Sequence, residues 1–170
     1  AVAALTDYYR ARVPQGGRVL DLMSSWVSHL PDDVAYAEVV GHGMNAEELG
    51  TNPRLDRWFV QDFNQNPVLA LADQSFDAAL ACCGVQYLQR PAEVFKEVRR
   101  VLVAGAPFIV SFSNRCFPTK AVEVWRALDI NGHAALVKLY LERAGFTDVQ
   151  VGLLADGQTS DPLVAATGHA

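Results

Sequence analysis

Short apolar runs recur along the first two thirds of the chain, separated by polar turns and amphipathic stretches. They lie at residues 18–22, 34–40, 57–60, 76–81 and 108–112. Apolar runs of this length, without strict alternation, are typical of strands that are buried on both faces of a parallel sheet. The pattern therefore predicts an α/β protein with a mostly parallel sheet.

Helical spacing of apolar residues fills most of the gaps between these runs. We expect a helix before Pro14, a helix over 91–102 that Gly105 ends, and two helices between Thr119 and Gly145, with Thr119 as the N-cap of the first. Pro91 suits a first helical turn and glycine suits a helix end. Shorter helices are expected at 46–49, capped by Asn45, and for a turn or two at 26–30.

The end of the chain has a different pattern. Apolar residues alternate at Val149, Val151 and Leu153 within residues 146–154, and a final apolar run follows at 163–166. Alternation with a period of two is typical of half-buried antiparallel strands. An antiparallel hairpin that closes the sheet is therefore expected.

Composition narrows the class of protein. With 170 residues, 51% of them hydrophobic, the chain is expected to form one domain spanning residues 1–170. The net charge of −5, a pI near 5.3 and the lack of a basic block disfavour a nucleic-acid surface. No run approaches the ~20 apolar residues that span a bilayer. The oligomeric state stays open.

The cysteines and the N-terminus bear on location. Three cysteines, two of them adjacent at Cys82 and Cys83, suit a reducing compartment better than a disulfide framework. No signal peptide is visible, so a cytoplasmic location is expected. The first residue is not Met, so an organelle remains the alternative if an N-terminal segment is missing.

Four local sequences resemble motifs of one enzyme family. Residues 19–22, 75–80, 97–106 and 143–146 read VLDL, SFDAAL, EVRRVLVAGA and RAGF. They are similar to the hhDh (h, apolar), SFDhVh, ExxRVLKPGG and AGF motifs of class I S-adenosylmethionine-dependent methyltransferases. The likeness is greatest to the type 11 subgroup, which includes the ubiquinone and menaquinone methyltransferases. Met23 to Trp26 stand where that family usually has glycines.

This resemblance implies the rest of the architecture and the chemistry. It implies a Rossmann-like three-layer sandwich with a seven-stranded sheet in the order 3-2-1-4-5-7-6. It also implies S-adenosyl-L-methionine as cofactor and a small-molecule acceptor. Methyl transfer from a sulfonium mainly requires that nucleophile and methyl be held in line in a dry pocket, so no catalytic triad or metal is expected.

The resemblance also implies a set of cofactor-binding residues at the strand ends. Asp21, with the backbone of Met23 and the hydroxyls of Ser24 and Ser25, would hold the amino-acid part, although Asp21 as a cap of the next turn is the alternative. Trp26 could fill part of the cofactor space or belong to the core. The remaining cofactor candidates are Gly41, Gly43, Asn45, Asp62, Phe63 and Cys83.

For several of these candidates a purely structural role is the alternative to cofactor binding. Alignment on Gly41 puts Gly43 where the family has an acid that accepts the ribose hydroxyls, and Asn45 would either substitute or simply cap a helix. Asp62 would accept a hydrogen bond from the adenine amino group, and Phe63 would cover the adenine ring. The alternative is that Asp62 forms a turn and Phe63 belongs to the core.

The acceptor side is less well marked. Tyr87 or Asn114 could orient a nucleophile, while Gln86, Ser113 and Arg115 are more consistent with a polar rim. The four histidines, which have no metal-ligand spacing, are expected to be surface or capped residues: His29, His42, His133 and His169.

Two other classes of function share this layered fold. A nicotinamide oxidoreductase would share the layered fold, but it needs G-x-G-x-x-G after the first strand and an acid after the second, and both are absent. A methyltransferase-like domain that has lost activity and serves as a binding or scaffolding module fits the substitutions at 23–26 and 43. Either the enzyme or the module is compatible with the fold.

Overall fold

The computed structural model describes all 170 residues and contains one seven-stranded sheet in the order β3-β2-β1-β4-β5-β7-β6. The strands are β1 (Arg18–Leu22), β2 (Glu38–Gly43), β3 (Arg57–Val60), β4 (Ala78–Cys82), β5 (Pro107–Ser113), β6 (Thr147–Ala155) and β7 (Leu163–His169). The helices are α1 (Val2–Arg12), α2 (Ala46–Thr51), α3 (Pro91–Val101), α4 (Glu123–Arg126) and α5 (Ile130–Arg143), with a 3-10 turn at Val85–Tyr87.

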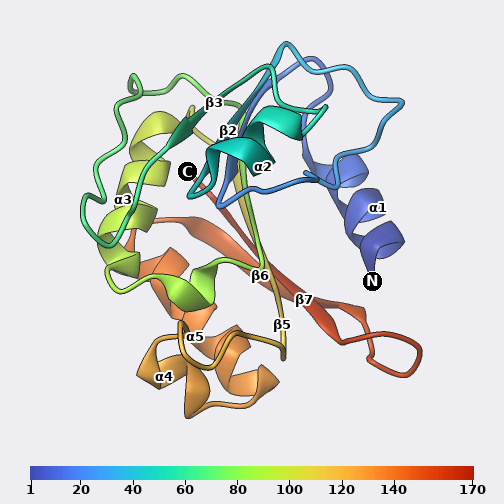
Figure 1. The fold of residues 1–170 in the computed structure, drawn as a ribbon, viewed down its shortest axis with the longest axis vertical. Coiled ribbons are helices and arrows are strands. Elements are labelled where there is room, and N and C mark those ends of the chain that lie inside the picture. The colour runs from blue at the N-terminus through green and yellow to red at the C-terminus, as the bar shows by residue number, and fades with distance from the viewer.

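The sheet separates two apolar cores, so the molecule has three layers. Alternate residues of each strand point to opposite faces. Leu20 of β1 packs in the larger core with α3 and α5, whereas Val19 packs in the smaller core with Tyr9 of α1. Figure 1 shows α1 and α3 on opposite sides of the sheet. The predicted three-layer α/β sandwich and its strand order are confirmed.

The hairpin at the end of the chain is antiparallel, as predicted. β7 inserts between β5 and β6 and pairs antiparallel with both, while the five preceding strands run parallel. Leu163 to Ala166 are buried because β7 is an inner strand. Val151 and Leu153 of the edge strand β6 remain partly exposed to solvent.

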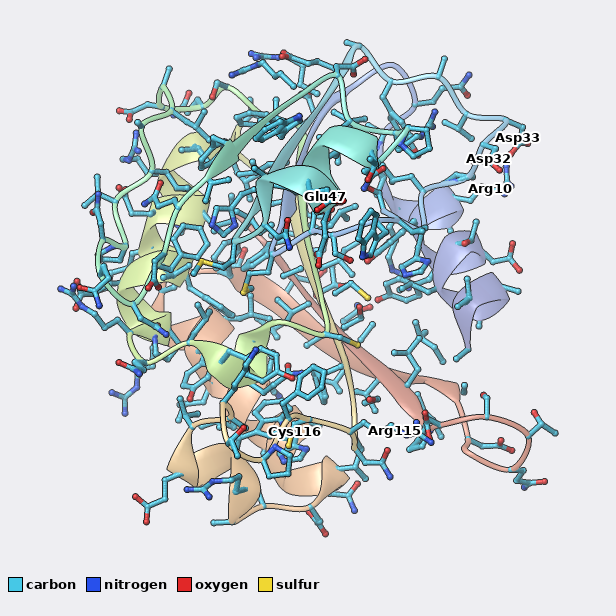
Figure 2. All side chains as sticks on the ribbon, viewed as in Figure 1. Arg10, Asp32, Asp33, Glu47, Arg115 and Cys116 are labelled. Carbon is cyan, nitrogen blue, oxygen red and sulfur yellow. The ribbon has the colours of Figure 1, made fainter.

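Two predictions for the segment between β1 and β2 are wrong. Residues 26–30 form no helix, and β2 begins at Glu38 instead of residue 34. Pro31 and the serines give this segment no apolar stripe that could hold a helix against the sheet. The segment instead crosses as an irregular chain, and Arg10 of α1 pairs with its Asp33 at 2.8 Å (Figure 2).

The prediction that Thr119 caps a helix is also wrong. The helix in that region, α4, has only four residues, and its N-cap is Val122, which makes no side-chain cap bond. The following helix α5 is capped by Asp129, whose Oδ1 accepts a hydrogen bond of 2.8 Å from the Gly132 N–H. None of the helices combines the length and hydropathy needed to span a bilayer.

Candidate functional site

A cleft of about 1020 Å³ opens at the carboxyl ends of β1 to β4. In open parallel sheets this edge is where ligands bind, and the volume is of the size that encloses a small organic ligand. Nine of the ten cofactor-binding candidates line it: Asp21, Met23, Ser24, Ser25, Gly43, Asn45, Asp62, Phe63 and Cys83. Residues from four strand ends are therefore brought to one hollow.

Asp21 lies at the inner wall of the cleft and is only 3% exposed. The hydroxyl of Ser24 donates a hydrogen bond of 2.7 Å to its Oδ2. Burial raises the pKa of Asp21 to about 6, while the hydroxyls of Ser28 and Ser24 act in the opposite direction. A carboxyl group in this environment is costly to ionise. A cationic partner in the cleft would therefore stabilise the ionised form of Asp21.

The chain after Asp21 is held by side chains instead of by a helix. Asn52, buried at the end of α2, donates from Nδ2 to the Ser28 hydroxyl at 3.0 Å and to the Ser25 carbonyl at 2.9 Å. Met23 has a left-handed backbone with φ of 51°. This network leaves the hydroxyls of Ser24 and Ser28 at the wall of the cleft. The serine loop is defined here as residues 23–28.

His42 joins three of the strand ends beneath the cleft. The Met23 N–H donates to His42 Nδ1 at 3.1 Å, and Nε2 lies 2.7 Å from the Gln61 carbonyl oxygen. These contacts require a neutral ring that carries its proton on Nε2. Burial lowers the pKa of His42 to about 4, and the ring stacks on Phe63 at a centroid distance of 3.9 Å.

Gly43 and Gly41 have steric reasons for lacking a side chain. A Cβ on Gly43 would lie 2.7 Å from the carbonyl oxygen of Ser24, which is closer than real Cβ contacts allow. A Cβ on Gly41 would lie 2.3 Å from Leu55 Cδ1, and Gly41 does not line the cleft. Gly41 is therefore a packing residue, and the position of Gly43 cannot hold an acid while the serine loop stays in place.

Asn45 is a helix cap, as the structural alternative predicted. Its Oδ1 accepts hydrogen bonds from the N–H groups of Glu47 and Glu48, at 3.0 and 3.2 Å. Its Nδ2 lies 3.4 Å from Oε1 of Glu48, which also lines the cleft. Glu48, in the first turn of α2, was not anticipated from the sequence.

Asp62 and Phe63 follow the end of β3, and both line the cleft. Asp62 Oδ1 accepts a hydrogen bond of 2.9 Å from the Asn64 N–H, which is the geometry of a turn-forming aspartate. Phe63 is buried to 4% exposure. The turn role and the core role are thus present, and Oδ2 of Asp62 has no hydrogen-bond partner in the structure.

Cys82 and Cys83 lie where β4 enters the cleft, next to the end of β1. Cys83 has a left-handed backbone with φ of 53°, and its N–H donates to the Ser111 carbonyl at 2.8 Å. The interaction between the two neighbouring thiols lowers the pKa of Cys83 and raises the pKa of Cys82. All three cysteines of the chain are free thiols.

The opposite rim of the cleft is formed by aromatic and basic residues. Tyr87 lines it, and its hydroxyl accepts a hydrogen bond of 3.1 Å from the Phe117 N–H. Lys120 lies with Nζ 5.6 Å from the Phe117 ring and is the one lysine or arginine among the lining residues. The candidate Asn114, which directly follows β5, does not line the cleft.

Trp26 does not occupy the hollow. Its side chain is 50% exposed and does not line the cleft. Both proposed locations for the indole, the cofactor space and the core, are therefore wrong. Asn52 holds the inner side of the serine loop through the Ser25 carbonyl and the Ser28 hydroxyl, and the indole points to solvent.

The histidines were expected to be surface or capped residues, and for two of the four the surface alternative is wrong. His42 and His133 are almost fully buried, and His133 stacks on Trp125 at 3.9 Å. His29 lines the cleft with a left-handed φ of 56°. No group of three or more His, Cys, Asp or Glu side chains is arranged to hold a metal ion.

Among the site residues that the sequence analysis missed are Ser28, His42, Glu48 and Asn52. Each is a common surface residue type without a recognisable motif, so only its three-dimensional partners reveal a role. His42 carried one usable signal: a polar residue within an apolar strand run, which requires buried partners.

A family model described as a methyltransferase domain matches residues 23–110, just over half of the chain. No curated protein matches the chain.

Solved structures share the fold at low sequence identity. A protein described as a methyltransferase, in complex with the Haloferax volcanii Trm112 methyltransferase activator, is 17% identical with a TM-score of 0.73, over 98% of this chain and 88% of its own. Phosphoethanolamine N-methyltransferase 2 of Haemonchus contortus, in complex with S-adenosyl-L-methionine, is 12% identical with a TM-score of 0.69, over 98% and 52%. The cyclase SpnF is 18% identical with a TM-score of 0.72, over 97% and 80%. At these identities the similarity concerns the fold alone.

Proposed function

The chain belongs to the methyltransferase domain family, and from that premise we propose that it binds S-adenosyl-L-methionine and transfers the methyl group to a small-molecule acceptor. The observation that carries this proposal is the open cleft beside buried Asp21, whose carboxyl group lacks a cationic partner. The ubiquinone and menaquinone subgroup stays a prediction.

The residues of the cleft fit the parts of this cofactor. Asp21 would face the ammonium group and the hydroxyl of Ser25 would donate to the carboxylate, while the Ser24 hydroxyl keeps its hydrogen bond to Asp21. Met23 would border the methionine chain through its backbone. Cys83, at the end of the adjacent strand β4, would border the sulfonium region.

The far end of the cleft suits a nucleobase. The free oxygen of Asp62 would accept from the adenine amino group, and the edge of Phe63 would contact the ring. The bound cofactor supplies an electrophilic methyl group, and the chain contributes alignment and exclusion of water. Three free cysteines are consistent with action in a reducing compartment such as the cytoplasm.

The acceptor would enter over the rim formed by Tyr87, Phe117 and Lys120. Tyr87 is the acceptor-side residue that we retain, because its ring lines the cleft. Its hydroxyl already accepts from the Phe117 N–H, so its own proton remains available to a bound nucleophile. Asn114 would act only on an acceptor large enough to extend past the cleft.

The second candidate is a binding or scaffolding module without methyl transfer. Two observations favour it: no helix follows β1 to direct N–H groups at an anion, and Gly43 offers no carboxylate. The fold also serves other chemistry, since SpnF is a cyclase.

Isothermal titration calorimetry separates the two candidates. The wild-type chain is titrated with S-adenosylmethionine and with S-adenosylhomocysteine, and the proposed enzyme should bind both with a dissociation constant in the micromolar range. Adenosine and methionine, each titrated alone, serve as matched probes of the two halves of the cleft. Absence of heat up to millimolar cofactor would contradict the enzyme and favour the module.

A further inference from the structure

We infer that Glu48, in the first turn of α2, is the residue that accepts the hydroxyls of a bound ribose. The inference rests on the proposed function, because it assumes that the cleft holds a nucleoside. In open α/β sheets the ribose is commonly read by a carboxylate near the end of the second strand. The question is which group of this chain can supply that carboxylate.

Position 43, at the end of β2, is closed to an acid. The Ser24 carbonyl oxygen would lie 2.7 Å from any Cβ built there, and this oxygen belongs to the main chain and has no rotamer to move to. Ser24 is also tied to β2, because its N–H donates a hydrogen bond of 2.7 Å to the carbonyl oxygen of His42. The serine loop therefore excludes an acidic side chain at this position.

The side chain of Asn45 already caps helix α2. Its one side-chain acceptor, Oδ1, receives two backbone N–H groups at the start of α2. Its Nδ2 points to Oε1 of Glu48 at 3.4 Å. Asn45 thus has no acceptor left for a ribose hydroxyl, and its amide instead orients the neighbouring carboxylate.

Glu48 remains the carboxylate at this part of the cleft. It lines the cleft together with Gly43 and Met44 and is only partly exposed. Asn45 contacts Oε1, which leaves Oε2 without a partner among the side chains around it. The other acids of the lining are engaged elsewhere: Asp21 accepts from Ser24, and Asp62 closes a turn.

A carboxylate that accepts two hydroxyl groups should have a measurable effect on affinity. A hydrogen bond to a charged group is worth about 1.5–3 kcal/mol, which corresponds to a change in dissociation constant of roughly 10- to 100-fold. Glu47 provides the control, because it lies one residue away on α2 (Figure 2), is exposed, and is outside the cleft lining.

The experiment compares Glu48→Gln and Glu47→Gln with the wild-type chain by calorimetry. Each protein is titrated with S-adenosylhomocysteine and with its 2′-deoxy analogue, and thermal melts check that both variants fold. Glu48→Gln should weaken S-adenosylhomocysteine binding roughly 10- to 100-fold, whereas Glu47→Gln should change it less than about threefold. Wild type should prefer the ribose form over the deoxy form, and Glu48→Gln should lose that preference.

The outcomes separate this inference from the proposed function. If wild type binds and Glu48→Gln behaves like Glu47→Gln, the ribose role of Glu48 is wrong while the cofactor proposal stands. If Glu48→Gln weakens both ligands equally and keeps the preference, the carboxylate acts on something other than the hydroxyl. If wild type binds neither ligand, the proposed function fails and the inference fails with it.

Discussion

Two crossover segments connect parallel strands of the sheet, and different interactions hold each of them in place. Between β1 and β2, residues 23–37 return to the sheet without a helix, held by hydrogen bonds among side chains around Asp21. Between β4 and β5, residues 83–106 return through the regular helix α3. The first segment forms a wall of the cleft, and the second supports the sheet from behind.

The difference lies in what each segment buries. Helix α3 buries Val94, Phe95, Val98 and Val101 on one stripe, while Arg100 on its other side pairs with Glu97 at 2.5 Å and Asp73 at 2.6 Å. The first crossover instead buries polar groups, whose hydrogen bonds must be satisfied one by one. Non-directional burial builds the scaffold, and directional bonds place the groups that would contact a ligand.

The largest effect should come from the apolar crossover. Phe95→Ala removes a ring that is fully buried against Phe108 and Tyr140, so the free energy of unfolding should fall by about 3–5 kcal/mol. Urea denaturation followed by circular dichroism measures this. Lys96→Ala, exposed on the next residue of the same helix, should cost less than about 0.5 kcal/mol. If Phe95→Ala lowers the free energy of unfolding by less than about 1 kcal/mol, the apolar stripe of α3 does not hold this crossover in place.

Asp21→Asn should stabilise the free protein at neutral pH and abolish cofactor binding. Burial raises the pKa of Asp21 from 3.8 to about 6, so ionising it in the folded state costs about 3 kcal/mol above pH 6. The amide keeps an acceptor for the Ser24 hydroxyl without the charge. Urea denaturation at pH 7.5 tests the gain in stability, and calorimetry with S-adenosylhomocysteine tests the loss of binding.

The pH dependence of stability sharpens this prediction. The folded state keeps the Asp21 proton between pH 4 and 6 while the unfolded chain loses it, so this group makes stability fall as pH rises. His42, whose pKa burial lowers from 6.5 to about 4, makes stability rise across nearly the same window. The two slopes largely cancel in wild type. Asp21→Asn should therefore expose a rise in stability from pH 4 to 6.5, and an unchanged profile would contradict the buried charge.

Asn52→Ala should have the smallest effect on stability and a disproportionate effect on the cleft. It removes the donor to Ser28 and Ser25, so unfolding free energy should fall by about 1–3 kcal/mol. Amide hydrogen exchange in the serine loop should accelerate while α3 stays protected. Asn131→Ala, on an exposed position of α5, is the matched control. Equal exchange in both variants would show that the loop does not depend on Asn52.

The contrast between the segments also explains which predictions from sequence were right. Helix α3 was predicted because Pro91, the apolar stripe and Gly105 are local signals that agree with the final packing. The short helix predicted at 26–30 is absent because the partners that hold the serine loop, Asn52 and His42, lie far along the chain. Nine of ten cofactor candidates reached one hollow because parallel strand ends converge there.

The sequence by itself determined the order of the strands and helices, the antiparallel hairpin and the edge of the sheet where polar residues gather. These follow from periodicity and turn residues, which act over short distances along the chain. Only the tertiary structure decided that Trp26 points outward, that Gly43 is sterically closed to an acid and that Glu48 stands beside it. The first two outcomes depend on contacts between segments that are distant in the sequence, and the third depends on how α2 packs beside the end of β2.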